Sequence, residues 1–512
     1  MNWTALIIFV LLFGFITVLG FFAANWRRGD LDLLHEWGLA GRRLGTLVVW
    51  FLLGGDAYTA YTFIAVPALV FGAGAIGFFA LPYTIIVYPL VFLILPRMWA
   101  VAHKHNYITA ADFVQGRYGN RWLALAIALT GIIATMPYIA LQLLGIEVVI
   151  GAMGVQAQGF LGDLPLIIAF VILAAFTYTS GLRAPAMIAV VKDLLIYVTV
   201  IAMVVVIPIE LGGYGNLFAA VPESKLLLTS PKDGNLGQYS AYATLALGSA
   251  FALFLYPHTV TAILSSSGRE VIRRNAAYLP AYSFLLGLLA LTGFMALALN
   301  VNKLPEFADQ FARYGTNFAV PALILHTFPS WFAGVAFAAI AIGGLVPAAI
   351  MSIAASNLFT RNIYVPFINP DRTPQQEAKN AKIVSLIVKF GALVFIIFLP
   401  LQYAIQLQLL GGIWISQTIP AVIVSLYTPW LNPWALLIGW AVGILTGTWM
   451  AASQAFQSAV VPLSLGSLTI PGYAALYALG LNFALSIVLS ALLNPVRGTR
   501  GEDQTAAADY QM

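Results

Sequence analysis

The residues best suited to chemistry lie at 53–62, which read LGGDAYTAYT inside an apolar run from about residue 44 to 71. Two adjacent glycines each weaken a helix by about 1 kcal/mol, and an aspartate near the bilayer centre costs about 3 kcal/mol. These residues predict a membrane helix that is broken at mid-depth, where free carbonyls and the Asp56 carboxylate face a polar cavity. The alternative is a Gly-rich packing face in which Asp56 is neutral or paired.

The composition excludes a water-soluble protein. Of the 512 residues, 61% are hydrophobic and 8% are charged, with a mean hydropathy of +0.91, whereas a soluble domain carries about 25% charged residues. Cysteine is absent, which excludes disulfides and thiolate metal sites. Most of the five histidines lie in loops or near helix ends, and the basic residues are spread over loops. We therefore expect neither an enzyme nor a nucleic-acid-binding protein.

Apolar windows of about 20 residues predict thirteen membrane helices, and so an all-α polytopic protein with the lipid bilayer as its surroundings. The first run follows no basic residues and lacks a convincing cleavage site, so we interpret it as a retained helix instead of a signal peptide. The windows are 3–25, 45–71, 76–98, 122–150, 163–181, 186–209, 243–266, 279–299, 329–357, 383–400, 405–426, 434–452 and 472–494.

The lysines and arginines predict the orientation, because short cytoplasmic loops hold most of them. With the N-terminus outside, twenty fall on the cytoplasmic side and four outside, and the C-terminus lies in the cytoplasm. The four outer residues are Lys225, Lys232, Lys303 and Arg313. We expect residues 210–242 to form a partly ordered external cap, and the polar tail 497–512 to be disordered.

A second break is predicted at 253–261, which read LFLYPHTVT. Pro257 removes a backbone donor and clashes with the preceding turn. The two broken helices start five spans apart, which is the offset expected for two five-helix halves related by an inverted repeat, with the substrate where the breaks meet. The alternative is a simple proline kink, which is common in membrane helices.

Four motifs on the predicted cytoplasmic side resemble the sodium:solute symporter family. They are EWGLAGRRLG at 36–45, YITAADFVQGRYG at 107–119, TSGLRAP at 179–185 and LFTRNIY at 358–364. The resemblance extends from about residue 39 to 495. Within the family, GGDAYTAY and the Tyr-Pro-His segment look most like the bacterial permeases for lactate, pyruvate and related short acids. We expect Arg183, Lys192 and Asp193, in and after the third motif, to anchor the inner loop.

The resemblance implies a LeuT-like transporter core of five plus five helices, with one helix before it and two after it. The implied function is cation-coupled import of a short monocarboxylate across the bacterial inner membrane by alternating access. Alternatives are a sodium-coupled symporter for an amino acid, another organic acid or a vitamin, and a membrane sensor. The implied divisions are 1–43, the first repeat 44–210, an extracellular loop 211–242, the second repeat 243–426, two C-terminal helices 427–496 and the tail 497–512.

In that family a sodium ion is held by backbone carbonyls of the first broken helix, which correspond to Gly55 and Tyr58, and by hydroxyls of the ninth span. An alignment without gaps places Val346 and Pro347 at the hydroxyl positions, and a shifted register recovers only Ser352. Sodium prefers a cage of oxygens, by extension of the rules for hard cations. The missing ligands therefore weaken the case for sodium.

A proton needs only a titratable group that can reach both sides of the membrane. Asp56 and His258 are the candidates, because burial can bring a carboxyl or an imidazole into the neutral pH range. The alternative for His258 is a structural hydrogen bond that closes the proline kink. We expect no cofactor; the coupling ion is a proton or sodium, with facilitated exchange as a further alternative.

A short carboxylate can be held by hydroxyls and by the N-terminal amides of half-helices, whose dipoles favour anions, without a buried arginine. Polar residues near the breaks and on the eleventh span are the candidate contacts, and hydrogen bonding between helices is the alternative for each. The candidates are Thr59, Thr62, Tyr138, Gln142, Thr259, Trp414 and Gln417.

Overall fold

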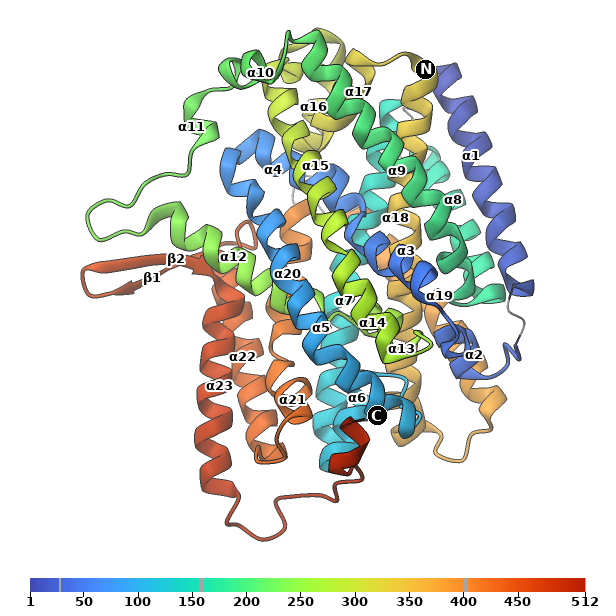
Figure 1. The fold of residues 1–512 in the computed structure, drawn as a ribbon, viewed down its shortest axis with the longest axis vertical. Coiled ribbons are helices and arrows are strands. Elements are labelled where there is room, and N and C mark those ends of the chain that lie inside the picture. Colours follow the sequence, from blue (N-terminus) through green and yellow to red (C-terminus); the bar gives the residue numbers. More distant parts are fainter. Residues whose placement is uncertain (27–28, 156–159, 399–403, 512) are drawn as a thin grey trace.

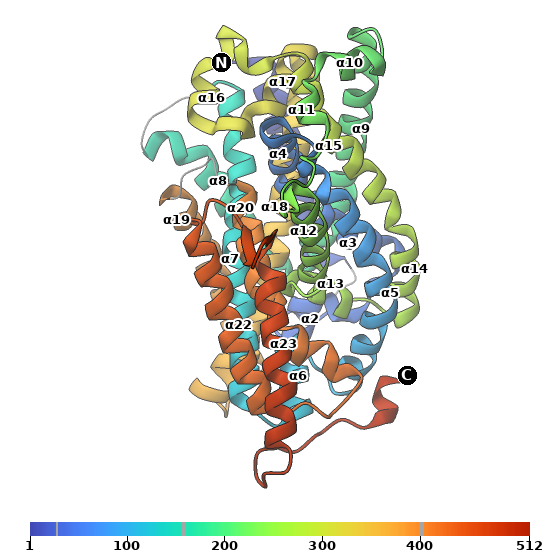
Figure 2. The same cartoon turned by 90° about the vertical axis from the view of Figure 1, so that its left-hand side faces the viewer.

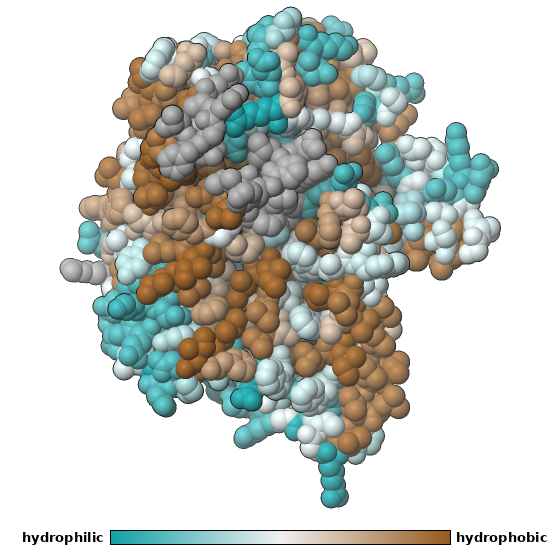
Figure 3. Space-filling view, turned by 180° about the vertical axis from the view of Figure 1, so that it is seen from behind, coloured by the Kyte–Doolittle hydropathy of each residue, from teal (hydrophilic) through white to brown (hydrophobic). Residues whose placement is uncertain are grey.

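A computed structural model describes residues 1–26, 29–155, 160–398 and 404–511, without the side chains of 56, 57, 160–163, 395–398, 404, 405 and 407. It is a bundle of helices whose long axis is vertical in Figure 1, with the two termini toward opposite ends. Hydrophobic side chains dominate the middle of one face and hydrophilic ones gather toward its ends (Figure 3). The all-helical membrane architecture is confirmed.

Eight helices or continuous helical runs in the described residues are long and apolar enough to cross a membrane, or ten if each of two bent pairs is one span. Two shorter apolar helices, Thr46–Gly55 and Leu164–Ser180, fall on further predicted spans. The sequence windows number thirteen partly because they divide the run Tyr61–Lys104 between two spans. Part of the window 383–400 lies outside the described residues.

Among the described residues up to 226, the chain forms eleven α-helices, besides short 3-10 and π turns. They are α1 (Trp3–Phe22), α2 (Leu34–Leu39), α3 (Thr46–Ala57), α4 (Val66–Ala73), α5 (Ala80–Lys104), α6 (Ala110–Tyr118), α7 (Arg121–Ala152), α8 (Phe160–Ser180), α9 (Arg183–Glu210), α10 (Tyr214–Ala220) and α11 (Glu223–Leu226). Of these, α10 and α11 are the only short helices in the predicted external cap that the structure describes.

From residue 237 on, the described residues add twelve α-helices and two strands, again besides short 3-10 and π turns. They are α12 (Gly237–Leu253), α13 (Pro257–Leu264), α14 (Arg269–Tyr278), α15 (Pro280–Ala298), α16 (Ala308–Tyr314), α17 (Ala319–Thr327), α18 (Ser330–Phe359), α19 (Pro374–Phe398), α20 (Ala404–Ser416), α21 (Ile419–Val422), α22 (Pro433–Ser453), β1 (Val460–Leu465), β2 (Leu468–Tyr473) and α23 (Ala474–Leu493).

The predicted first break lies directly after α3. Tyr58 leaves the helix with extended backbone angles, φ −105° and ψ 91°. The chain then re-enters a helix through a π-helical turn at Tyr61–Ala65, which continues into α4. The carbonyls around residue 58 therefore lack the helical partners that an unbroken helix would supply.

The predicted second break separates α12 from α13, which are bent by 47°. Tyr256 is extended, with ψ 139°, and Pro257 is the first residue of α13. Proline suits this position because the first amide of a helix has no intrahelical partner. A third break, bent by 50°, separates α20 from α21 at residues 417–418, and Pro420 lies in the first turn of α21; the sequence windows had predicted one span there.

The centre of the bundle is α18, which is buried along almost its whole length. Its middle is rich in alanine and glycine, and such small residues let neighbouring helices approach closely. It contacts α7, α1 and α9, and both Figure 1 and Figure 2 show it enclosed by other helices. This rigid core lies between the two predicted breaks.

Two features differ from the sequence predictions. Strands β1 and β2 form an antiparallel hairpin between the last two helices, a segment for which the sequence analysis predicted no element, and it projects from the side of the bundle (Figure 1). The C-terminal tail, predicted to be disordered, folds back onto the bundle. Asp509 contacts Lys104 at 2.5 Å, and Asp503 contacts Arg117 at 2.7 Å. These long-range ion pairs order a segment whose composition alone indicates disorder.

Candidate functional site

The first break is closed by a buried lysine from α9. Lys192 Nζ donates to the carbonyl oxygen of Gly55 at 2.6 Å and to that of Tyr58 at 3.1 Å. It also lies 2.9 Å from Asp193 Oδ1, and both side chains are 0% exposed. An ammonium has three donors, and three oxygens surround this one. The ion pair is thus tied to the backbone of the broken helix.

Tyrosines surround the other side of this ion pair. The Tyr282 hydroxyl donates to Asp193 Oδ2 at 2.6 Å, and the Tyr58 hydroxyl donates to the Tyr282 carbonyl at 2.8 Å. The two rings lie 4.8 Å apart. These contacts hold Asp193 as a carboxylate acceptor and connect α9, α15 and the first break in one buried network.

The adjacent glycines of the first break have separate packing roles. A Cβ on Gly54 would lie 2.1 Å from the Tyr282 ring, and one on Gly55 would lie 2.7 Å from Lys192 Nζ. Real Cβ contacts do not approach so closely, so each glycine makes room for one side chain of the network. The pair of glycines therefore serves the buried lysine and tyrosine as well as the break itself.

The prediction that Lys192 and Asp193 anchor an inner loop is wrong. The helix α9 begins at Arg183, and nine residues place Lys192 about 13.5 Å along it. Arg183 does anchor a loop, because it donates to the Glu36 carbonyl at 2.7 Å and pairs with its carboxylate. Burial alone would raise the pKa of Glu36, but hydrogen bonds from Arg183 and Arg43 hold it below its usual value.

The residues at the Gly55 and Tyr58 carbonyls do not fit a sodium ion. The lysine ammonium already binds both oxygens. On α18, a Cβ built on Gly343 would lie 3.8 Å from the Tyr58 carbonyl oxygen. One turn later come Val346 and Pro347, which have no hydroxyl. Ser352 lies nine residues, about 13.5 Å, along the helix, and its hydroxyl donates within α18.

The hydroxyls of the first break support its backbone. Thr62 accepts from the Thr59 amide and donates to the Thr59 carbonyl, both at 2.9 Å. Gln142 of α7 accepts from the Ala60 amide through Oε1 at 3.0 Å. Its buried Nε2 has no hydrogen-bond partner among the described residues. Gln142 therefore keeps its Nε2 group as a donor for a bound molecule, whereas the Thr62 hydroxyl both donates and accepts within the break, and the Thr59 hydroxyl accepts from the Tyr61 amide at 3.0 Å.

The second break is lined by aromatic rings. Tyr138 lies one turn before Gln142 on α7, and its ring is 5.3 Å from that of Tyr256 and 5.5 Å from that of His258. His258 is fully buried. Thr259 donates to the Leu253 carbonyl at 2.9 Å, which fixes the turn between α12 and α13. Tyr138 of α7 therefore contacts His258 at the start of α13, where Thr259 also lies, whereas Gln142 of the same helix contacts the first break.

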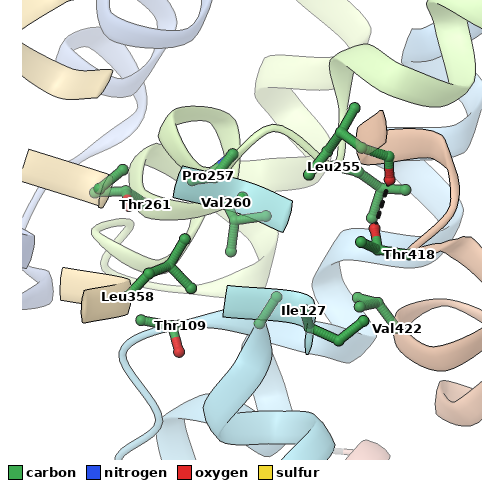
Figure 4. Close-up of a pocket in the computed structure, with 13 residues that line it drawn as sticks. Thr109, Ile127, Leu255, Pro257, Val260, Thr261, Leu358, Thr418 and Val422 are labelled. Carbon is green, nitrogen blue, oxygen red and sulfur yellow. Dashed lines mark hydrogen bonds between the residues drawn. The ribbon is translucent and has the colours of Figure 1, made fainter. Parts of the chain in front are cut away.

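Two small cavities adjoin this end of α13. One is mostly apolar and lies between α3, α5 and α12, where Leu53, Tyr88 and Phe254 face Thr259. The other lies between α13, α7, α18 and α21 and extends toward Thr109 (Figure 4). The second cavity is lined by Thr261 and Thr418, which the sequence analysis did not single out. Both are threonines within apolar segments, the same signal that identified Thr259.

The structure does not bring Trp414 and Gln417 to the two predicted breaks. Trp414 Nε1 donates to Thr448 of α22 at 3.0 Å. Gln417 donates to the Ile413 carbonyl at 3.1 Å and accepts from Asn482 of α23 at 3.3 Å. Their polar groups join α20 to the last two helices, which was the alternative stated for them.

The Asp56 side chain lies outside the described residues. Its predicted role in ion coupling therefore stays a prediction, and so do the roles predicted for the other site residues.

The sodium:solute symporter family model matches residues 37–443. The chain belongs to the sodium:solute symporter family. The symporter is 53% identical to a protein of Rhizobium johnstonii named monocarboxylate transport permease protein, over 96% of this chain and 97% of the relative. It is 33% identical to the uncharacterized symporter YodF of Bacillus subtilis, over 86% and 87% of the two chains.

A solved structure shows the same fold. It is the substrate-bound, outward-open state of a Na⁺-coupled sialic acid symporter, and it covers 97% of this symporter and 99% of its own chain with a TM-score of 0.75 and 15% identity. The family and the fold together make this chain a cation-coupled membrane symporter and not an enzyme.

Proposed function

We propose that the symporter imports short monocarboxylates, such as lactate or pyruvate, by alternating access around the two breaks. The observation that carries this proposal is the 53% identity, over nearly the whole of both chains, to a protein named for monocarboxylate transport. The site chemistry supports it, because the described residues at the breaks offer neutral donors and apolar walls suited to a small anion.

The carboxylate would lie at the N-terminus of α13, close to Gln142. The amides that follow Pro257 begin this helix at the second break, and the positive end of a helix dipole favours an anion. The Gln142 Nε2 is a buried donor without a partner among the described residues, and an unsatisfied buried donor costs about 1 to 3 kcal/mol. A bound carboxylate would remove that cost.

The apolar cavity beside Thr259 would take the short carbon chain. Its walls are Leu53, Val87, Leu253 and Phe254, with the Tyr88 ring at one side. A second carboxylate would be desolvated there without a charged partner, which is unfavourable. This arrangement supports selection of monocarboxylates over dicarboxylates.

For the coupling cation we propose a proton instead of sodium. The support is that Lys192 binds the two carbonyls that would otherwise hold sodium. The candidate proton carriers are His258, which is buried against Tyr138 and Tyr256, and Asp56. Either would have to exchange its proton with both sides during the cycle.

The division into repeats 44–210 and 243–426 belongs to the same proposal, together with a bacterial inner-membrane location, the N-terminus outside and the C-terminus in the cytoplasm. It is supported by the distribution of lysine and arginine and by the two breaks at equivalent places in the two halves.

Counterflow in proteoliposomes tests the solute directly, because it needs recognition and alternating access but no imposed ion gradient. Vesicles preloaded with unlabelled lactate should accumulate labelled lactate transiently from outside. Unlabelled pyruvate should compete, and succinate and proline should not. Counterflow with proline but not with lactate or pyruvate would contradict the proposed substrate class.

A further inference from the structure

We infer that Lys192 is a built-in replacement for the sodium ion, so that this symporter binds no sodium at the Gly55 and Tyr58 carbonyls and needs none for transport. The inference rests on the proposed transport function, but it does not depend on which solute is carried. It is drawn from the surroundings of the Lys192 ammonium group. The oxygens around it, the charge balance, the packing and the facing helix α18 all disfavour a second cation at this position.

Three oxygens surround the ammonium. It donates hydrogen bonds to the carbonyls of Gly55 and Tyr58 at 2.6 and 3.1 Å, and it forms an ion pair with Asp193 Oδ1 at 2.9 Å. A sodium ion at the same carbonyls would lie within a few ångströms of a like charge. In a buried site that repulsion is far stronger than in water.

The charge of the site is already balanced. Asp193 is the described carboxylate next to the carbonyls, and it is held by Lys192 on one oxygen and by the Tyr282 hydroxyl on the other. The ion pair is neutral as a unit. Among the described side chains, therefore, no net negative charge is left at this position to attract a further cation.

The packing keeps the ammonium in place. Gly55 has no Cβ, and one built there would meet Lys192 Nζ at 2.7 Å and Asp193 Oδ1 at 3.4 Å. Both charged side chains are 0% exposed, and α3 and α9 contact each other along this region. The lysine thus fills the volume between the break and α9.

The opposite wall offers no replacement ligands. There α18 presents Gly343 to the Tyr58 carbonyl, followed one turn later by Val346 and Pro347. Neither of these side chains carries an oxygen. A sodium ion that displaced the lysine would therefore have two carbonyls and Asp193, and it would lack the hydroxyls that complete an oxygen cage.

The consequence is a permanent link between α9 and the first break, at the position where a sodium-coupled symporter would have a reversibly bound ion. The Lys192 side chain connects α9 to the free carbonyls of Gly55 and Tyr58. This connection needs no ion that binds and dissociates during the transport cycle. Removal of external sodium should therefore neither open the break nor slow transport.

Sodium binding to the purified full-length protein tests the inference without any measurement of solute transport. Thermal unfolding and binding of radioactive sodium are followed as NaCl replaces choline chloride at constant ionic strength. The wild-type protein should show no saturable shift in melting temperature and no saturable binding. Saturable sodium binding to the wild-type protein overturns the inference.

Two lysine variants sharpen the test. Lys192→Ala leaves two carbonyls and the Asp193 carboxylate around a vacated position, where water can supply the ligands that α18 does not. We therefore expect saturable sodium stabilisation to appear in this variant. Lys389→Met is the matched control, because Lys389 is also 0% exposed and its Nζ reaches only the Ser385 carbonyl, at 3.5 Å, in the described contacts. It should respond like wild type. A sodium response in Lys389→Met equal to that of Lys192→Ala would also contradict the inference.

The wild-type measurement decides the inference even if Lys192→Ala does not fold. It also separates this inference from the proposed solute. Absent lactate counterflow together with absent sodium binding contradicts the monocarboxylate proposal and leaves the role of Lys192 standing. Lactate counterflow together with saturable sodium binding supports the monocarboxylate proposal and contradicts the inferred role of Lys192.

Discussion

Lys192 Nζ donates a 2.6 Å hydrogen bond to the carbonyl oxygen of Gly55, across the interface between α9 and the broken helix α3. A carbonyl freed by a helix break inside a membrane must find a partner within the protein. Here that partner is a charged side chain with its own counterion, Asp193. We expect this contact to stabilise the break, and in our proposal it takes the place of a coupling sodium ion.

The ion pair should be worth more as a pair than either member alone. Lys192→Met leaves Asp193 buried without its counterion, and removal of one partner from such a pair costs about 3 to 5 kcal/mol. The double variant Lys192→Met with Asp193→Asn removes both charges and should regain most of that loss. Melting temperatures of the purified variants measure this. A double variant less stable than Lys192→Met would contradict the pairing.

Gly55→Ala should disturb the break selectively. The added Cβ would meet Lys192 Nζ at 2.7 Å, and overpacking of this kind costs about 1 to 3 kcal/mol. Because the ammonium must move, we expect uptake to fall about tenfold or more. Gly45→Ala is the matched control at the start of the same helix, where a Cβ meets nothing within 4 Å. Equal uptake by the two variants would argue against the close approach.

Gln142→Glu should weaken substrate binding without opening the break. The carboxylate keeps an acceptor for the Ala60 amide, now bound through Oε1, but it replaces the free Nε2 donor with a negative oxygen. We expect the KM for lactate counterflow to rise about tenfold or more, with expression unchanged. Gln142→Leu should instead lose stability, since it leaves the Ala60 amide unpaired. An unchanged KM in Gln142→Glu would remove this residue from the substrate site.

The docked tail should depend on pH through Asp509. The Ala506 amide, Lys104 and His105 hold the pKa of Asp509 well below its usual range. A carboxyl with a lowered pKa contributes stability above its free-chain pKa of about 4, and that stability is lost as the pH falls toward the lowered value. Docking should therefore be complete at neutral pH and weaken below pH of about 4.

Hydrogen exchange of residues 500–511 measures tail docking. Asp509→Asn should exchange faster at neutral pH, whereas Asp371→Asn, an exposed aspartate on another loop, should exchange like wild type. Protection of the tail that is the same in all three proteins would show that these ion pairs do not hold it.

The breaks could be predicted from the sequence because their signals are local. Adjacent glycines in an apolar run and a proline inside one weaken a helix, and the structure has breaks at both places. The same residue types also lie inside the continuous helix α18, at Gly343, Gly344 and Pro347, so packing decides which weak point becomes a break. The hairpin β1–β2 and the docked tail carry no such local signal. They depend on contacts between distant residues, such as Asp503 with Arg117.

The site was predicted less completely than the fold. Gly55, Tyr58, Tyr138, Gln142, His258 and Thr259 do lie at the breaks, but the lysine that joins the first break to α9 was assigned to a loop. A signal was present, because a Lys-Asp pair lies in the apolar run 186–209. Charged residues inside a membrane segment are costly, and they therefore indicate a functional site. The glutamine and tryptophan of α20 show the opposite case, in which polar groups served helix packing.

The most direct measurement is lactate accumulation by proteoliposomes under an inward proton gradient in sodium-free choline buffer, compared with an inward sodium gradient at equal internal and external pH. The proposed function and the role of Lys192 together predict accumulation with the proton gradient alone and none with the sodium gradient alone. Accumulation that requires sodium would contradict the claim that Lys192 has taken the place of the sodium ion.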